Sequence, residues 1–177
     1  MPMIELLKKL KLQLLVLQLK LRVLLLREKL TIPDLPKPKA LVIHHVGGSG
    51  NFAQVNVYHK RKWGFKSSLG YYIGYHYFIG VLGKITQGRA DNEEGAHCVE
   101  KARPGYWNKN SVGICLQGNL DEQEPTIEQL NALKRLLTRL KAKYKIGSKS
   151  VYLHKQISST VCPGKKLIAR LKVGLAI

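Results

Sequence analysis

The segment Ala40-Leu41-Val42-Ile43-His44-His45 is an apolar run that ends in two histidines. Such a run predicts a buried strand that carries a histidine to its carboxyl end. Downstream, Val151-Tyr152-Leu153-His154 repeats the arrangement, and Cys162-Pro163-Gly164 begins eight residues after His154. Two imidazoles and one thiolate suit a borderline-soft ion such as zinc, and three protein ligands leave a fourth position for water. If the side chains converge, the pattern predicts a zinc hydrolase.

Each of these motifs also has an ordinary structural interpretation. A histidine at the end of a strand is more often a hydrogen-bonded structural residue than a ligand. The sequence Cys-Pro-Gly also marks the start of many helices. The combination favours a metal site, because two strand-end histidines and one cysteine at a helix entry occur together. The residues alone leave open whether His44 or His45 is the ligand.

Strands and helices alternate along residues 40–177, which predicts an α/β layered domain. Beyond the first strand we expect strands over 75–81, 85–87, 111–118 and 151–153, and a short helix over 52–62. Residues 88–110 are rich in loop-forming residues. The clearest helix opens at Thr126, which forms a capping box with Gln129. Its apolar stripe is Leu130, Leu133, Leu137 and Leu140, and we expect Gly147 to end it. A last helix should follow Gly164.

Residues 1–30 form a separate, leucine-rich arm. Seven basic residues against two acidic ones give this segment a net charge of +5. On a helical wheel the polar residues fall on two nearly opposite stripes with apolar stripes between them. This suits a helix that contacts neighbours on two sides or lies in lipid, and a strand is the minority alternative. We therefore expect a basic amphipathic helix, which either binds an anionic envelope surface or packs on the domain or on itself.

The arm does not have the pattern of a targeting segment. Its uninterrupted apolar runs reach only four residues, whereas a membrane-spanning helix needs ~20 and a signal peptide ~7–15. Three prolines within residues 31–39 predict an extended linker between the arm and the domain. We expect synthesis in a host cytoplasm without a signal peptide.

Composition limits the class of partner and the redox state. The chain has 30 Lys and Arg against 11 Asp and Glu, a net charge of +19. This predicts a polyanionic partner: nucleic acid, an anionic membrane or an acidic cell envelope. No common nucleic-acid-binding motif occurs, so nucleic acid is the weakest of the three. Three cysteines do not suggest a disulfide framework, and we expect Cys98 and Cys115 to be reduced and partly buried.

The chain resembles the zinc-dependent N-acetylmuramoyl-L-alanine amidases of the type-2 amidase family, which includes phage endolysins and peptidoglycan recognition proteins. The resemblance covers residues 41–167 and leaves out the arm. The matching segments keep the family's order along the chain: Leu41–His45, Ile73–Ile79, Gln87–Arg89, Gly95–His97, Trp107–Ile114, Gly118-Asn119, Pro125–Leu130 and His154–Gly164. The resemblance implies a central, mainly mixed β-sheet flanked by helices.

The resemblance also implies roles for individual residues. It places zinc on His44, His154 and Cys162, with His45 turned toward the core or behind the metal. It places Tyr75 and Thr160 beside the reacting bond, where each would hydrogen-bond the water or the developing oxyanion. It assigns Trp63, His97 and Asn108 to the substrate groove. No carboxylate matches a general base, and Glu93 or Glu94 would be a guess. Residues 98–106 are longer than the family's usual connection.

These residues imply hydrolysis of the bond between N-acetylmuramic acid and L-alanine in peptidoglycan at the bacterial cell wall, as in a phage-type endolysin. Non-catalytic recognition proteins of the family lack the cysteine ligand, and Cys162 is present. A recognition module that binds peptidoglycan without cutting it, and a bacterial amidase that recycles cell wall, are the alternatives.

Overall fold

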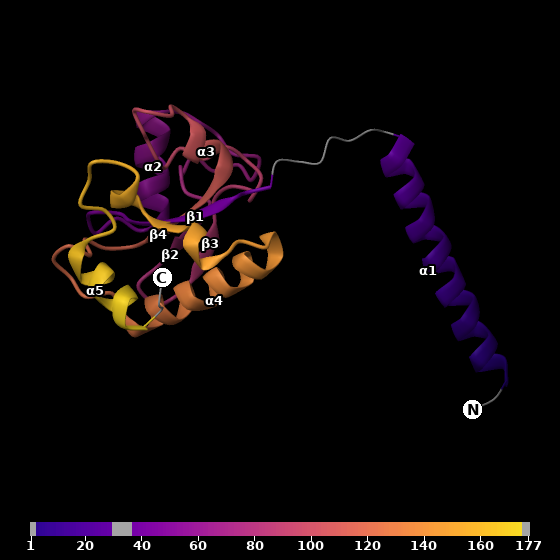
Figure 1. The fold of residues 1–177 in the computed structure, drawn as a ribbon. Helices are drawn as coiled ribbons and strands as arrows, with labels where there is room; N and C mark the ends of the chain where they lie inside the picture. Colours follow the sequence, from indigo (N-terminus) through magenta and orange to yellow (C-terminus); the bar gives the residue numbers. More distant parts are fainter. Residues whose placement is uncertain (1–2, 30–36, 175–177) are drawn as a thin grey trace. The chain divides into compact units, whose positions relative to one another are not determined.

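The computed structural model describes residues 3–29 and 37–174, together with most of their side chains. The chain divides into two compact units, Met1–Leu35 and Pro36–Ile177. Among the described residues, the first contains the helix α1 (Met3–Lys29), and the second contains a five-stranded sheet with its covering helices (Figure 1). The expected arm helix is therefore present, and the strand alternative for this segment is wrong. Most of the expected 31–39 linker lies outside the described residues.

The sheet of the second unit is mixed, as the resemblance implied. Its strands are β1 (Ala40–His45), β2 (Tyr77–Ile79), β3 (Ile85–Gln87), β4 (Ser111–Leu116) and β5 (Val151–Leu153), in the spatial order β3-β2-β4-β1-β5. Strand β1 pairs in parallel with β4 and β5, β2 pairs in parallel with β4, and only β3 is antiparallel. The carboxyl ends of four parallel strands therefore meet at one edge, where His44 and His154 lie.

Helices cover both faces of the sheet (Figure 1). Helices α4 (Ile127–Tyr144) and α5 (Lys165–Gly174) lie on one face, and α2 (Phe52–Lys62) and α3 (Tyr106–Asn110) lie on the other. Alternate residues of a strand point to opposite faces. Leu41 and Ile43 accordingly pack in the core of the α4/α5 face, whereas Val42 packs with Trp107 on the α2/α3 face.

The long helix α4 begins as the sequence predicts and ends earlier. The Thr126 hydroxyl accepts the N–H of Gln129, and the Gln129 side chain accepts the N–H of Thr126, so the capping box is confirmed. The helix ends at Tyr144 rather than at Gly147. Lys145 takes a left-handed conformation (φ 56°) and its N–H bonds to the Lys141 carbonyl. Ile146 is buried, so the chain turns into the core before it reaches the glycine.

Two further sequence expectations need adjustment. Residues 88–110, expected as loop, contain the five-residue helix α3, which is too short to show a helical period. Strand β2 starts at Tyr77, so Tyr75 lies just before the strand rather than inside it. Helix α2, strands β3 and β5, and the start of α5 after Gly164 match their predicted ranges. No helix in the described part of the chain is long and apolar enough to cross a membrane.

Candidate metal centre and the pocket around it

The two adjacent histidines of β1 point to opposite faces of the sheet. His45 lies on the α4/α5 face, where its Nδ1 accepts the N–H of Leu120 at 3.0 Å. His44 lies on the α2/α3 face and is 1% exposed. The alternation of side chains along the strand therefore decides which histidine can be a ligand. His45 is hydrogen-bonded to the backbone on one face, and His44 faces the predicted site on the other.

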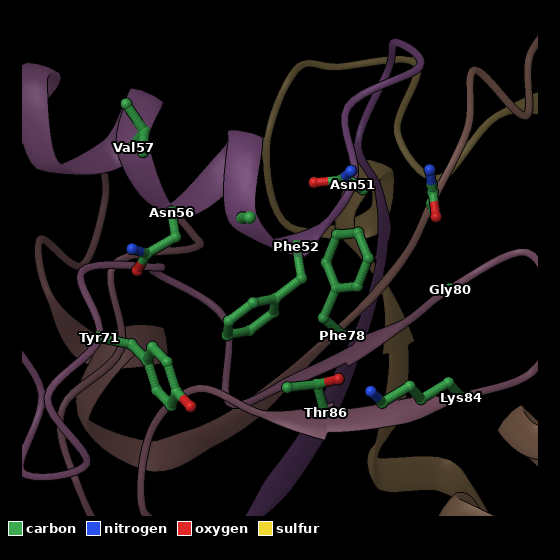
Figure 2. Close-up of a pocket in the computed structure, with 11 residues that line it drawn as sticks. Asn51, Phe52, Asn56, Val57, Tyr71, Phe78, Gly80, Lys84 and Thr86 are labelled. Atoms are coloured by element: carbon green, nitrogen blue, oxygen red, sulfur yellow. The ribbon is translucent and has the colours of Figure 1, made fainter.

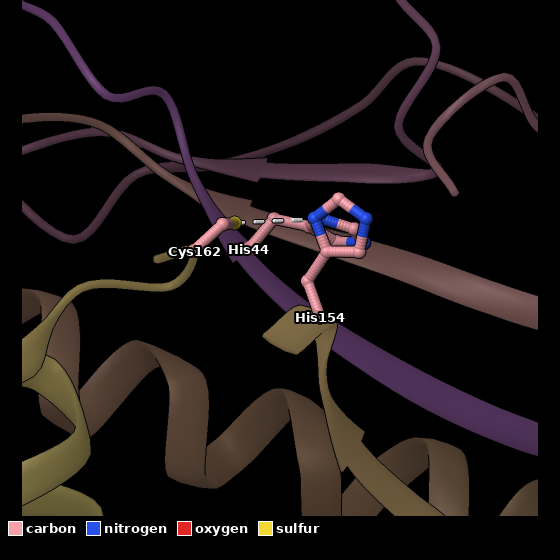
Figure 3. A group of neighbouring side chains, drawn as sticks. All are labelled: His44, His154 and Cys162. Carbon is pink, nitrogen blue, oxygen red and sulfur yellow. Dashed lines mark hydrogen bonds between the residues drawn. The ribbon is translucent and has the colours of Figure 1, made fainter. Parts of the chain in front are cut away.

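The structure brings His44, His154 and Cys162 together (Figure 3). One ligand-type atom from each lies within 4.8 Å of the others. His44 Nδ1 is 3.7 Å from Cys162 Sγ, and the rings of His44 and His154 have centroids 4.5 Å apart. The strands set this proximity, because Ile43 is paired with Leu153 and a histidine directly follows each of these two residues. Cys162 enters from the loop before α5.

The donor set and its spacing fit a zinc ion. Adjacent ligands of tetrahedral zinc, at the usual Zn–N and Zn–S lengths, lie about 3.6 Å apart, and the His44–Cys162 separation agrees with this. His154 Nε2 is buried and has no hydrogen-bond partner among the described residues. A buried polar atom of this kind is costly unless something binds it. A metal ion is such a partner.

Burial keeps both histidines in the form that a metal needs. It lowers the pKa of His154 to about 4, and it lowers the pKa of His44 well below its usual value, with the neighbouring His97 adding to the effect. Both imidazoles are therefore neutral at pH 7. Burial raises the pKa of the Cys162 thiol to about 12, while the N–H of His45, which donates to its sulfur at 3.4 Å, acts in the opposite direction. Metal binding therefore has to displace the thiol proton.

His97 stands directly behind His44. Its Nδ1 lies 3.1 Å from His44 Nε2, and the two rings meet edge to face. Because His44 Nδ1 is the atom that faces the sulfur, Nε2 is left to carry the proton and donate to His97. This contact fixes the tautomer and the ring orientation of His44. The family resemblance implied a place for His97 in the substrate groove, and it did not predict this contact with His44.

Two glycines make room for the His97 ring. A Cβ atom on Gly113 would lie 2.5 Å from His97 Cγ, and one on Gly95 would lie 2.4 Å from His97 Cδ2. Neither position tolerates a side chain unless the imidazole moves. In the sequence, the position of the His97 ring is marked only by two glycines, in the Gly-Ala-His and Val-Gly-Ile segments. Their role is clear only in the fold, where β4 lies beside the loop that carries His97.

A pocket of about 870 Å³ opens over the cluster of His44, His154 and Cys162. Six predicted site residues line it: Trp63, Tyr75, His97, Asn108, His154 and Thr160. Residues 98–102 form another part of its wall, so the long 98–106 connection shapes this opening.

Tyr75 and Thr160 offer hydroxyl groups beside the cluster. The ring of Tyr75 is 5.3 Å from that of His44, centroid to centroid. Burial, followed by the nearby thiols of Cys115 and Cys162, raises the pKa of Tyr75 well above its usual value, so the phenol keeps its proton. The Thr160 hydroxyl accepts the N–H of Cys162 at 3.2 Å, which leaves its own proton free to donate.

The remaining candidates of the groove differ in how they are held. The Asn108 side-chain oxygen accepts the N–H groups of His97 and Cys98, so this residue shapes the loop that carries His97. Trp63 is 40% exposed and packs its ring on His59, with centroids 4.5 Å apart. Cys98 and Cys115 are free thiols, as expected, and both are fully buried.

Glu93 is committed to the local structure. Its carboxylate accepts the N–H and hydroxyl of Ser68 and the N–H of Ala90, and it forms an ion pair with Arg89. Arg89 in turn bonds the Ile73 and Phe65 carbonyls, which holds the loop before Tyr75. These bonds use the lone pairs that a general base would need, so Glu93 is a structural residue here.

A second pocket, of about 610 Å³, lies between α2 and the β2–β3 hairpin (Figure 2). Phe52 and Phe78 meet on its floor with ring centroids 5.8 Å apart, and Lys84 and Thr86 line one side. None of its lining residues is a histidine, cysteine or carboxylate. Among the described residues, the group that could hold a metal ion, His44, His154 and Cys162, lies at the other pocket instead.

Comparison with known proteins agrees with this geometry. Residues 34–165 match the sequence profile of the N-acetylmuramoyl-L-alanine amidase family, Amidase_2. The chain belongs to this amidase family. A relative, peptidoglycan-recognition protein SD of Drosophila simulans, is 32% identical over 148 residues, which cover 78% of this chain and 74% of the relative.

Solved structures of two kinds resemble this amidase-family chain. One is the N-acetylmuramoyl-L-alanine amidase LysC of Clostridium intestinale, with a TM-score of 0.66 and 30% identity over 80% of this chain and 87% of that one. Another is a mutant of Drosophila PGRP-LB in complex with tracheal cytotoxin, with a TM-score of 0.63 and 26% identity over 79% and 83% of the two chains. The mixed sheet flanked by helices is therefore the fold of amidases and of recognition proteins alike.

Proposed function

We propose that this protein is a zinc-dependent enzyme that hydrolyses the amide bond between N-acetylmuramic acid and L-alanine in bacterial peptidoglycan. The observation that carries the proposal is the cluster of His44, His154 and Cys162 beneath the 870 Å³ pocket. Family membership and the likeness to LysC support the reaction type. The named relatives among recognition proteins support peptidoglycan as the ligand.

The residues of the cluster would hold the metal, and its neighbours would handle the substrate. Zinc bound by His44, His154 and Cys162 supplies a Lewis acid and lowers the pKa of a water from 15.7 to about 7. Tyr75, which keeps its proton, donates to the oxygen of the scissile amide as negative charge develops there. Thr160 offers a second donor from the opposite loop. His97 and Asn108 position His44 and the pocket wall.

The main alternative is a recognition module that binds peptidoglycan without cutting it. Cys162 argues for the enzyme, since non-catalytic recognition proteins lack this ligand. The hydroxyls of Tyr75 and Thr160 beside the cluster argue the same way, because binding alone needs neither. A bacterial amidase that recycles cell wall would share this site, and the cell wall as the place of action belongs to the same proposal.

The arm is the part for which an anionic envelope surface was expected. What supports that expectation is the net charge of +5 in residues 1–30. A polybasic segment gains ~1 kcal/mol per Lys or Arg near an anionic membrane, and salt screens the gain. This charge does not account for the exposed apolar side chains of α1.

Digestion of purified peptidoglycan tests the proposed reaction. The products should carry new amino termini of L-alanine and no new reducing sugar ends, and metal analysis should give about one zinc per chain. New reducing ends would identify a glycosidase instead. Bound peptidoglycan without products would identify the recognition module.

The variant Tyr75→Phe tests the proposed chemistry within the same assay. Loss of one oxyanion donor lowers turnover by roughly 10²–10³-fold, and zinc should be retained because the phenol is not a ligand. Tyr71→Phe is the matched control, since Tyr71 lines the second pocket and its change should leave turnover as it was. Loss of zinc from the Tyr75 variant would make Tyr75 a structural residue.

A further inference from the structure

Helix α1 carries a strict seven-residue repeat. Seven apolar residues follow one another in alternating steps of four and three: Met3, Leu7, Leu10, Leu14, Leu17, Leu21 and Leu24. All seven lie on the helix, and their exposure ranges from 53% at Leu10 to 77% at Met3. A mean spacing of 3.5 residues keeps such side chains on one line when two helices supercoil around each other. We call this line the heptad seam.

We propose that α1 binds a second copy of α1 through the heptad seam, so that the protein is an oligomer held together by its arm. A seam with leucine at both core positions is self-complementary, because each side chain can enter the space between four side chains of an identical helix. Burying an aliphatic side chain of this size removes roughly 80 Å² from water, so seven on each of two helices remove roughly 1,100 Å². This reaches the ~1,000 Å² that a specific interface needs.

The residues beside the seam permit a parallel, in-register pair. In that arrangement the flanking position of one helix faces the flanking position five residues later on the other. Leu6 would then face Lys11, Gln13 would face Gln18, and Lys20 would face Leu25. No two like charges oppose each other in these three contacts. The long Lys11 and Lys20 side chains can cover the edges of the seam while their charges stay in water.

The pattern of α1 fits a second copy better than a lipid surface. A helix that lies on a membrane has one apolar face and a charged face opposite to it. Opposite the heptad seam, α1 carries another apolar stripe, made of Leu12, Leu15, Val16, Leu19 and Val23, all of them exposed. A regular spacing of four and three is also unnecessary for lying on lipid. Most basic residues lie in the strips between the two stripes, while Lys8 falls among the residues of the second stripe.

Self-association would give the arm a role in wall binding without any contact to the wall. Two or more catalytic units joined through α1 would meet the same peptidoglycan polymer, and the second binding event becomes intramolecular. This consequence rests on the proposed function, whereas the self-association itself depends on α1 alone.

The mass of the full chain in solution tests the proposal. One chain has a mass of 20.0 kDa, and light scattering after size exclusion should give at least twice that value. The double variant Leu10→Gln/Leu17→Gln interrupts the seam, and its mass should fall to that of one chain. The matched control Leu12→Gln/Leu19→Gln makes the same change, with the same spacing, on the opposite stripe, and it should remain at least dimeric. Glutamine is close to leucine in helix propensity, so neither variant opposes the helix itself.

A covalent test reads the register directly. Leu14→Cys places a thiol in the seam, and mild oxidation should link two chains through it, while Leu19→Cys on the opposite stripe should give little product.

A single-chain mass for the unchanged protein would overturn the proposal, and binding of such monomers to vesicles of anionic lipid would then assign α1 to a membrane surface. The proposal would also be overturned if both double variants became single chains, or if both cysteine variants were linked to the same extent. Either result would mean that the helices associate through apolar surface in general and not through the heptad seam. Zinc content and turnover on soluble muropeptides should not change in any of these variants, which separates this test from that of the proposed function.

Discussion

The two faces of the sheet are built by different means. The α4/α5 face is filled by aliphatic side chains, with Leu133, Leu136 and Leu140 of α4 packed on β1 and β4. The α2/α3 face also buries apolar residues, but it holds His44, His59, His76, His97 and Arg89 among them. The first face is stabilised by removal of apolar area from water. The second depends on hydrogen bonds and on empty space left by glycines, and this is the face that carries the candidate site.

Most ring nitrogens of the buried histidines on the α2/α3 face have a backbone or side-chain partner, and His97 Nε2 is one that has none among the described residues. His59 Nδ1 accepts the N–H of Gly74 at 2.9 Å, and His76 Nδ1 accepts the N–H of Gly113 at 3.0 Å. Buried polar groups cost stability unless they are paired. The α4/α5 face therefore supplies stability, and the α2/α3 face gives up part of it to hold the candidate site in place. Substitutions on each face test this division.

The largest effect should come from Cys162→Ala. Removal of a metal ligand should lower turnover by more than ~10³-fold and zinc content to near zero, because two imidazoles alone bind zinc weakly. Metal analysis and turnover on soluble muropeptides measure this. Cys115→Ala removes another buried thiol of the same face, and it should retain zinc; zinc content is the readout here, because this thiol also forms a hydrogen bond with the Tyr75 hydroxyl. Equal losses in the two variants would show that the face as a whole, rather than the ligand, had been disrupted.

Leu133→Ala should act on stability and leave the site intact. Leu133 is fully buried on the α4/α5 face, and a leucine-to-alanine change in a core costs about 2–5 kcal/mol. Urea unfolding should show the loss, with zinc bound per folded molecule unchanged. Leu82→Ala, at a position that is 84% exposed, should change stability by less than ~0.5 kcal/mol. A zinc loss in the Leu133 variant at low urea would couple the two faces more tightly than we propose.

The α4/α5 face could be predicted from the sequence more completely than the site on the α2/α3 face. The leucine period of α4, its capping box and the apolar run of β1 fix the α4/α5 face, because apolar burial follows the period of the element. The cluster of His44, His154 and Cys162 could be anticipated from family motifs. The contact of His97 with His44 could not, since it depends on where a loop crosses β4. The left-handed Lys145 and the short α3 follow from tertiary packing, which leaves no periodic trace in the sequence.

Acid should weaken the protein through the histidines of the α2/α3 face. Burial lowers the pKa of His76 to about 4 and that of His59 to about 4. The unfolded chain, with a histidine pKa near 6.5, therefore binds more protons than the folded chain between these values. Stability is complete above about pH 6.5 and falls as the pH drops toward 4, by up to roughly 3 kcal/mol for each histidine.

Urea unfolding at a series of pH values, on metal-free protein, measures this dependence. Metal-free protein is used so that loss of zinc at low pH does not contribute to the change in the unfolding midpoint. His59→Gln should show a shallower fall below pH 6.5 than the unchanged protein, because one titrating group has been removed. A midpoint that does not move between pH 7 and pH 5 would contradict the view that neutral imidazoles hold this face together.

His97→Ala should weaken zinc binding without abolishing it. His97 positions His44 through the 3.1 Å contact between their rings, and loss of such an outer partner typically costs 10–100-fold in metal affinity. Competition with a chelator measures the affinity, and turnover at saturating zinc should recover a large part of the unchanged value. Trp63→Ala is the control, because Trp63 lines the same pocket and packs on His59. Unchanged zinc affinity in the His97 variant would return His97 to the substrate groove alone.

The smallest effect should come from Thr126→Ala at the start of α4. The Thr126 hydroxyl accepts the N–H of Gln129 and donates to the Val81 carbonyl at 2.7 Å, so it both caps the helix and ties it to the loop after β2. Loss of a capping threonine costs about 1 kcal/mol. Thr138→Ala makes the same change at an exposed position inside the same helix, where alanine is the better helix former and stability should rise slightly. Urea midpoints that move in opposite directions, with turnover unchanged in both variants, would place the cap on the stabilising face alone. A fall in turnover of folded Thr126→Ala would mean instead that the start of α4 also positions the pocket on the other side of the sheet.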